Sequence, residues 1–124
     1  MLDVINTQLV FLRDNFAAVF FMLMAMHFIC DYPLQGDFLA KGKTLQSGFG
    51  PMRYYHLLAH SWIQAGGVFL VTGSLALATA ELIAHFIIDE MKNRNITNYE
   101  QDQLMHIFCK VWWISYIVYG GYFF

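Results

Sequence analysis

Charged residues are scarce in this chain of 124 residues. Lys, Arg, Asp and Glu together make up 13% of the sequence, whereas 58% of it is hydrophobic. Because ordinary soluble domains carry about 25% charged residues, this composition indicates a membrane protein. The few Lys and Arg are scattered and the net charge is -2, so the sequence also lacks the basic surface that a nucleic-acid ligand requires.

Proline and cysteine are equally rare, with two of each. Cys30 and Cys109 both fall inside apolar stretches, so we expect free thiols rather than a disulfide framework. Pro33 follows the first apolar run and Pro51 precedes the second, at positions where proline limits a helix.

Long apolar runs are what the chain does have. They predict four transmembrane helices at about residues 13–31, 54–71, 74–90 and 103–124. Helices of this length reach about 25 Å or more at 1.5 Å per residue, enough to cross a bilayer. A soluble bundle with a very apolar core is the alternative, but it would need polar outer faces that these runs lack. We therefore predict an all-α polytopic membrane protein, with residues 1–124 forming a single transmembrane domain that is a four-transmembrane-helix bundle.

The basic residues are distributed unequally between the two ends of the predicted bundle. Lys41, Lys43 and Arg53 lie in the first loop and Lys92 and Arg94 in the third, whereas Arg13 alone lies at the other end. The positive-inside rule then predicts that the first and third loops face the cytoplasm and that both termini lie outside.

All five histidines stand four residues from another His or Asp. The pairs are His27 with Asp31, His56 with His60, His85 with Asp89, and Asp102 with His106. A spacing of four puts both members on one helix face, and each predicted helix contributes one pair. From the helix directions, we expect Asp31, His56, Asp89 and Asp102 in an outer layer near the cytoplasmic face, and His27, His60, His85 and His106 in a second layer about 6 Å deeper.

The two halves of the chain resemble each other around these pairs. Residues 27–31 match residues 85–89 at four of five positions, and His56–His60 parallels Asp102–His106 in spacing. This pattern predicts two pseudo-repeated helical hairpins around one axis.

A further step of four residues inward reaches Gln64, Glu81 and Lys110. An unpaired charge at that depth would be costly, so we predict a buried ion pair between Glu81 and Lys110.

Imidazole and carboxylate groups gathered in this way suit a divalent metal, with zinc, manganese or iron fitting best. We predict metal ligands at His27, His56, His60, His85 and His106, and catalytic carboxylates at Asp31, Asp89 and Asp102. A purely hydrogen-bonded network of His and Asp is the alternative. Candidate substrate-binding residues beside the site are Gln35, Lys41, Lys43 and Gln103. The lysines among them suit an anionic lipid or a phosphorylated small molecule, although lysines beside a bilayer also serve as topology determinants.

The ordered set His27-x3-Asp31-x3-Gln35, Lys41, His56-x3-His60, His85-x3-Asp89 and Asp102-Gln103-x2-His106 resembles a family of small uncharacterised bacterial and phage integral membrane proteins. The resemblance covers about residues 24–110, and Pro33 is a departure from it. That family is similar in turn to membrane-bound metal-dependent hydrolases. The resemblance implies a place in the bacterial inner membrane, and it leaves open whether the chain forms homo-oligomers.

Three functions follow as hypotheses. The first is a metal-dependent membrane hydrolase that acts on an ester or phosphoester at the cytoplasmic face. The second is a proton or metal-ion transport or channel protein, although residues 68–80 and 112–124 offer such a pathway only hydroxyls and tyrosines. The third is a small phage-type membrane effector that binds a host partner, which would explain the size of the chain but not its histidines.

Overall fold

The computed structural model describes residues 1, 3–4, 7 and 14–119. Over these residues the chain is all-α, with no strand. The α-helices are α2 (Phe16–Asp31), α3 (Gly36–Gly42), α4 (Arg53–Thr72), α5 (Leu75–Asn93) and α6 (Tyr99–Tyr119), and two 3-10 turns, Leu45–Ser47 and Gly50–Met52, lie between α3 and α4. The prediction of an all-α helical bundle is confirmed.

The four long helices follow the predicted spans with shifted ends. The third and fourth reach further toward their shared turn than predicted, because α5 runs on to Asn93 and α6 begins at Tyr99. Helix α3 was not predicted. Arg13 and the predicted end of the fourth span at 120–124 lie outside the described residues.

A glycine and three polar side chains fix the helix ends at the two tight turns of the bundle, between α4 and α5 and between α5 and α6. Gly73 adopts the left-handed conformation after α4, with φ of 67°, and the Ser74 hydroxyl accepts a hydrogen bond from Leu77 N at the start of α5. At the start of α6, the Asn98 side chain accepts from Gln101 N, and the Gln101 side chain accepts from Asn98 N in return. This reciprocal pair is a capping box, which fixes where α6 begins.

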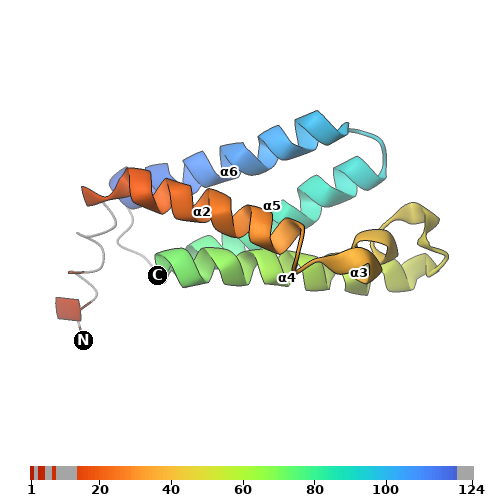
Figure 1. Ribbon diagram of the computed structural model, residues 1–124, viewed down its shortest axis with the longest axis horizontal. Coiled ribbons are helices and arrows are strands. Elements are labelled where there is room, and N and C mark those ends of the chain that lie inside the picture. Colours follow the sequence, from red (N-terminus) through yellow and green to blue (C-terminus); the bar gives the residue numbers. More distant parts are fainter. Residues whose placement is uncertain (2, 5–6, 8–13, 120–124) are drawn as a thin grey trace.

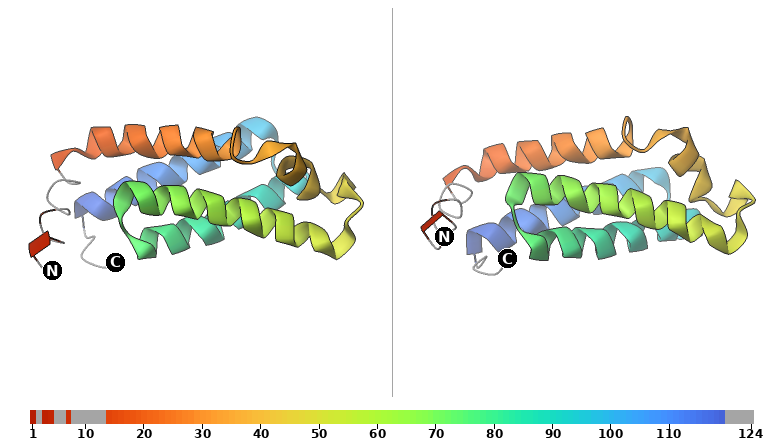
Figure 2. Two further views of the ribbon diagram at one scale, coloured as in Figure 1. Left: turned by 60° about the horizontal axis from the view of Figure 1, so that its bottom comes forward. Right: turned by 90° about the horizontal axis from the view of Figure 1, so that it is seen from below.

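The long helices pack as a four-membered ring. Helix α4 lies against α2 and α5, and α6 lies against the same two helices, so α2 is diagonal to α5 and α4 is diagonal to α6 (Figures 1 and 2). Helix α2 begins and α6 ends at one end of the bundle, while α3 and the α5–α6 turn lie at the other (Figure 1). The first and third loops, which contain the basic residues, therefore lie at the same end of the bundle, as the predicted topology requires.

The interior divides into an apolar half and a polar half. Buried apolar side chains pack together toward the end at which α2 begins and α6 ends: Val19, Leu23, Val68, Leu77, Trp113 and Ile117. The other half of the interior contains buried histidines, carboxylates and lysines. The candidate site lies in this polar half of the interior.

Among the described helices, none is by itself both long enough and apolar enough to cross a membrane. Helices α2 and α3 meet that standard only when taken together, and they are bent by 83° at the break between them.

Candidate metal centre

Three buried or half-buried carboxylates meet where α2 ends, α5 ends and α6 begins. Asp31 is the last residue of α2, Asp89 lies one turn before the end of α5, and Asp102 lies in the first turn of α6. Each has a histidine four residues away on the same helix face, at positions 27, 85 and 106, and those three rings are buried. The spacing in the sequence therefore does bring these six side chains into one region of the interior.

One group of donors surrounds His60 of α4. Its Nε2 lies 3.0 Å from Nε2 of His85 and 3.2 Å from Oδ1 of Asp31. Ligands about 2.1 Å from one tetrahedral or octahedral ion are about 3.0 to 3.4 Å apart. These two separations are those of ligands to a common ion, and the donor atoms of the three residues all lie within 4.8 Å of one another.

A second group surrounds His106 of α6. Its Nε2 lies 3.2 Å from Oδ1 of Asp89 and 3.5 Å from Oδ1 of Asp102. Asp89 also reaches the first group, since its Oδ2 lies 3.6 Å from His60 Nε2 and its Oδ1 lies 3.7 Å from His85 Nε2. The Asp89 carboxylate is therefore shared by both groups.

Several buried polar atoms in this region make no hydrogen bond within the described part of the chain. They include both ring nitrogens of His27 and Oδ1 of Asp102. The ring of His27 lies beside that of His106, with centroids 5.1 Å apart, and its Nε2 is 3.8 Å from Asp31 Oδ2. Buried polar groups are normally paired, so unpaired nitrogen and carboxylate oxygen atoms together fit a site for a metal ion. Three groups among the described residues could hold a metal ion, namely Asp31–His60–His85, Glu81–His85–His106 and Asp89–Asp102–His106, and the predicted ligand His27 belongs to none of them.

His56 is not brought to this cluster. Its ring stacks on Phe49 and meets Phe38 edge-on, with centroids 4.8 Å away in both cases. The reason is α3, which passes so close at Gly42 that a Cβ there would clash with the His56 ring. The sequence predicts His56 from helix spacing alone, and spacing within α4 carries no information about a segment packed over it.

Lys43 occupies the place in the outer layer that the sequence gives to His56. Its side chain is buried, and Nζ lies 2.6 Å from Asp89 Oδ2. Its backbone carbonyl accepts hydrogen bonds from Asn93 Nδ2 at 2.9 Å and from Arg53 Nη1 at 3.4 Å. Arg53 is itself fixed by two hydrogen bonds to Glu90, which raise the pKa of its guanidinium. The segment that follows α3 is therefore tied to both α4 and α5.

The deeper layer contains the Glu81 carboxylate and its donors. Lys110 Nζ lies 2.6 Å from Glu81 Oε1, and Trp113 Nε1 donates to Oε2 at 2.6 Å. Oε1 also lies 3.2 Å from Nδ1 of His85, so this nitrogen donates to the carboxylate. A neutral His85 then has its lone pair on Nε2, which faces His60 and Asp89.

The predicted substrate-binding residues divide between the site and the surface. Gln103 donates to Asp102 Oδ2 at 3.2 Å and to Asp31 Oδ2 at 3.5 Å, and Gln35 donates to the Asp31 carbonyl at 2.9 Å. Lys41 lies away from the cluster, exposed, and pairs with Asp37. Cys30 and Cys109 are free thiols, and neither contributes to the groups of metal-binding geometry among the described residues.

Two residues near the site were missed in the sequence. The Nζ atom of Lys92 lies 3.3 Å from Asp102 Oδ2. Burial lowers the pKa of this ammonium, but the negative charges of Asp89 and Asp102 outweigh burial, so the pKa is raised overall. Trp113 lies in the apolar run of the fourth helix, yet its Nε1 donates to Glu81. Both stand three residues from a recognised member, Asp89 or Lys110, and a spacing of three also shares a helix face.

No curated protein and no solved structure matches this chain. One family model matches residues 19–121, a range that includes every His and Asp pair described above. The prediction that the chain belongs to an uncharacterised family is confirmed, and the family's description assigns no activity. The chain is a member of the family described as proteins of unknown function, DUF3307.

Proposed function

We propose that the chain is a metal-dependent hydrolase embedded in a bilayer, with its site near the membrane face at which α2 ends and α6 begins. One observation carries the proposal: buried imidazoles and carboxylates from all four long helices converge at metal-ligand spacing, and several of their atoms lack a hydrogen bond within the described part of the chain. Ionisable groups are costly in a bilayer and are commonly functional there.

Support for the membrane placement comes from the distribution of polarity. Glu81 is the only Asp, Glu, Lys or Arg between Tyr54 and Ile88. Lys110 is the only one between Gln103 and Tyr119. Both side chains are buried. Large apolar side chains cover the outside instead: Phe21 is 70% exposed, Phe108 70% and Trp112 72%. A polar interior with an apolar exterior is the arrangement that a lipid environment favours.

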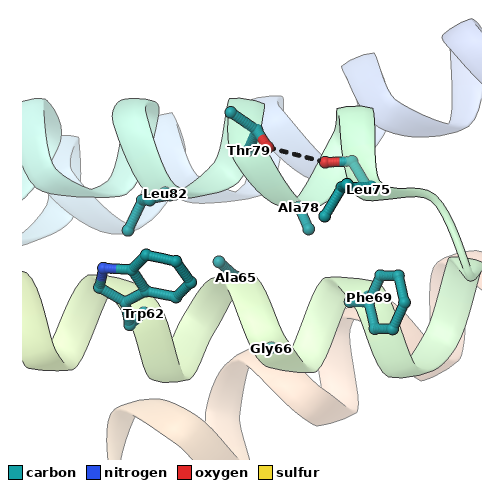
Figure 3. A pocket seen from close by; sticks show the side chains of 8 residues that line it. All are labelled: Trp62, Ala65, Gly66, Phe69, Leu75, Ala78, Thr79 and Leu82. Atoms are coloured by element: carbon teal, nitrogen blue, oxygen red, sulfur yellow. Dashed lines mark hydrogen bonds between the residues drawn. The ribbon is translucent and has the colours of Figure 1, made fainter. Parts of the chain in front are cut away.

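A groove on the outer face of α4 and α5 fits the same environment. Trp62 and Phe69 of α4 and Leu82 of α5 line it (Figure 3). Its polar side chain, Thr79, donates its hydroxyl to the Leu75 carbonyl at 2.8 Å within α5. The groove therefore presents an apolar lining, which suits an acyl chain better than water.

A divalent metal would supply Lewis-acid activation of water and of an ester or phosphoester group. Asp31, His60, His85, Asp89, Asp102 and His106 would hold it. His27, whose ring nitrogens make no hydrogen bond within the described residues, would accept a proton from the attacking water. Lys43 places a positive charge beside Asp89, where it would favour an anionic substrate, either a lipid headgroup or a phosphorylated small molecule.

The hypothesis of a proton or metal-ion transport or channel protein has less support. A pathway for protons or metal ions needs polar groups along the whole bundle. Beyond Glu81 and Lys110, the interior is filled by the apolar cluster around Leu23, Leu77 and Trp113. A site that is reached from one face agrees better with this division.

The test is purification of the full chain in mild detergent without chelator, followed by elemental analysis and assay against a panel of carboxylic and phosphoric esters. We expect bound zinc, manganese or iron, and hydrolysis that a chelator abolishes and added metal restores. His60→Ala should lower the metal content and abolish hydrolysis, whereas Asp37→Asn, which changes an exposed carboxylate, is the matched control. Less than about 0.2 equivalents of metal, without gain on adding metal, would refute the metal site. Metal uptake with no hydrolysis of any ester would refute the reaction.

We further propose that the first and third loops face the cytoplasm of a bacterial cell and that both termini lie outside. The five basic residues of those loops support this orientation. Reporter fusions at residue 124 should be active only outside the cytoplasm, and a fusion active only inside would reverse the orientation.

A further inference from the structure

We infer that the site holds two divalent ions, bridged by the Asp89 carboxylate. This inference rests on the metal site proposed above and adds its number of ions and its bridging ligand. It also bears on the class of substrate, because two ions change the charge of the site.

The first ion position has its own set of three donors. His60 Nε2, His85 Nε2 and Asp31 Oδ1 come from three different helices, and all three atoms lie within 4.8 Å of one another. His85 is held in the required orientation by Glu81, which accepts from its Nδ1. A carboxylate behind a histidine in this way fixes the ring and makes its other nitrogen a better ligand.

The second position has a separate set. His106 Nε2 and the Oδ1 atoms of Asp89 and Asp102 form it, again within 4.8 Å of one another. The two groups share no residue, although a third group of the same spacing, Glu81, His85 and His106, joins one member of each. Asp102 Oδ1 is buried, makes no hydrogen bond within the described residues and lies 3.5 Å from His106 Nε2. Its other oxygen is already bound by Gln103 and Lys92.

Asp89 is the link between the two. Its Oδ1 lies 3.2 Å from His106 Nε2 of the second set and 3.7 Å from His85 Nε2 of the first, and its Oδ2 lies 3.6 Å from His60 Nε2, so the carboxylate stands between the two sets. A carboxylate in that position binds one ion with each oxygen. The six ligands together exceed the four that a single zinc ion usually accepts, whereas two ions use all of them.

The charges of the site bear on the substrate rather than on the number of ions. Asp31, Asp89 and Asp102 give three negative charges, against two positive charges from Lys43 and Lys92. One divalent ion would leave a single positive charge, and two would leave three. A site of that charge selects an anionic substrate, so phosphoric esters should be preferred over neutral carboxylic esters. Because Lys43 Nζ lies 2.6 Å from Asp89 Oδ2, it must move when this oxygen binds an ion, and it is then free to contact the substrate.

Manganese is the probe that tests the pairing, since two bridged Mn²⁺ ions give an exchange-coupled electron paramagnetic resonance spectrum and an isolated ion gives six lines. The detergent-purified full chain, stripped and reloaded with Mn²⁺, should bind two ions and show the coupled spectrum. Asp31→Asn and Asp102→Asn should each reduce the content from two to one and leave a six-line spectrum. Asp37→Asn, whose side chain is 93% exposed, should keep both ions and the coupling.

The wild-type measurement decides the inference even if the variants fail to fold. One Mn²⁺ per chain with six lines would refute the bridged pair and leave the proposed metal site standing. No bound Mn²⁺, zinc or iron would refute both. Two ions without coupling would refute the Asp89 bridge. Two ions with the coupled spectrum, but faster hydrolysis of neutral esters than of phosphoric esters, would refute the inferred substrate preference alone.

Discussion

Removal of either member of the Glu81–Lys110 pair should destabilise the protein, and by unequal amounts. Both side chains are 1% exposed, and the two charged atoms are 2.6 Å apart. Glu81 is the hydrogen-bond acceptor that the described structure gives to Lys110, whereas Glu81 also accepts from His85 and Trp113. Glu81→Gln therefore leaves a buried ammonium without a counter-charge, at a cost of about 3 to 5 kcal/mol. Lys110→Met leaves a carboxylate that keeps two donors, so we expect about 2 to 3 kcal/mol.

The double variant Glu81→Gln/Lys110→Met removes both charges and should recover much of the loss, with a coupling energy of about 2 kcal/mol or more. The assay is unfolding of the detergent-purified chain, followed by circular dichroism during heating and denaturant titration. Asp37→Asn/Lys41→Met is the matched control, because this pair is exposed and its charged atoms are 3.8 Å apart. It should show no measurable coupling. A coupling below about 0.5 kcal/mol for the buried pair would refute the reasoning.

Three further predictions concern the outer layer of the site. Lys43→Met should raise the affinity for a divalent ion about tenfold or more, since the ammonium no longer competes for Asp89; competition with a chromophoric chelator measures this, and an unchanged affinity would contradict it. His56→Ala should leave the metal content unchanged, because its ring packs against two phenylalanines, and elemental analysis showing a lost ion would contradict that placement. Gly42→Ala should lower the free energy of unfolding by about 1 to 3 kcal/mol because the His56 ring must move. Gly66→Ala, with nothing within 4 Å of the added carbon, should not lower it, and equal melting temperatures for the two variants would show that no clash exists.

Periodicity in the sequence is enough to predict the bundle and most of the cluster. Apolar runs separated by Gly, Pro and polar turns give the long helices, because helix length and amphipathic spacing are local properties. The i to i+4 pairs give the shared faces, so His27, His85 and His106 arrive beside their carboxylates without any knowledge of the tertiary structure.

What the sequence could not give depends on contacts between segments far apart in the chain. Helix α3 is a helix of seven residues after Pro33, too short for a periodic signal to reveal. Its packing over α4 decides both that His56 faces two phenylalanines and that Lys43 reaches Asp89, which is 46 residues away. Neither outcome follows from the hydropathy of the residues involved.

The departure from internal symmetry is informative about the site itself. The repeat pairs α2 with α5 and α4 with α6, and these are the diagonal neighbours in the ring, so a two-fold axis along the bundle would exchange His60 with His106 and His56 with Asp102. Asp102 remains in the interior, but α3 keeps its counterpart His56 out and supplies Lys43 instead. A symmetric site would carry the same kind of group at both positions, whereas here one is the Asp102 carboxylate and the other is the Lys43 ammonium. Lys43 therefore adds a positive charge on the side that α3 covers, to the charge that Lys92 places beside Asp102, and the proposed anionic substrate would meet a cation at each of these two carboxylates.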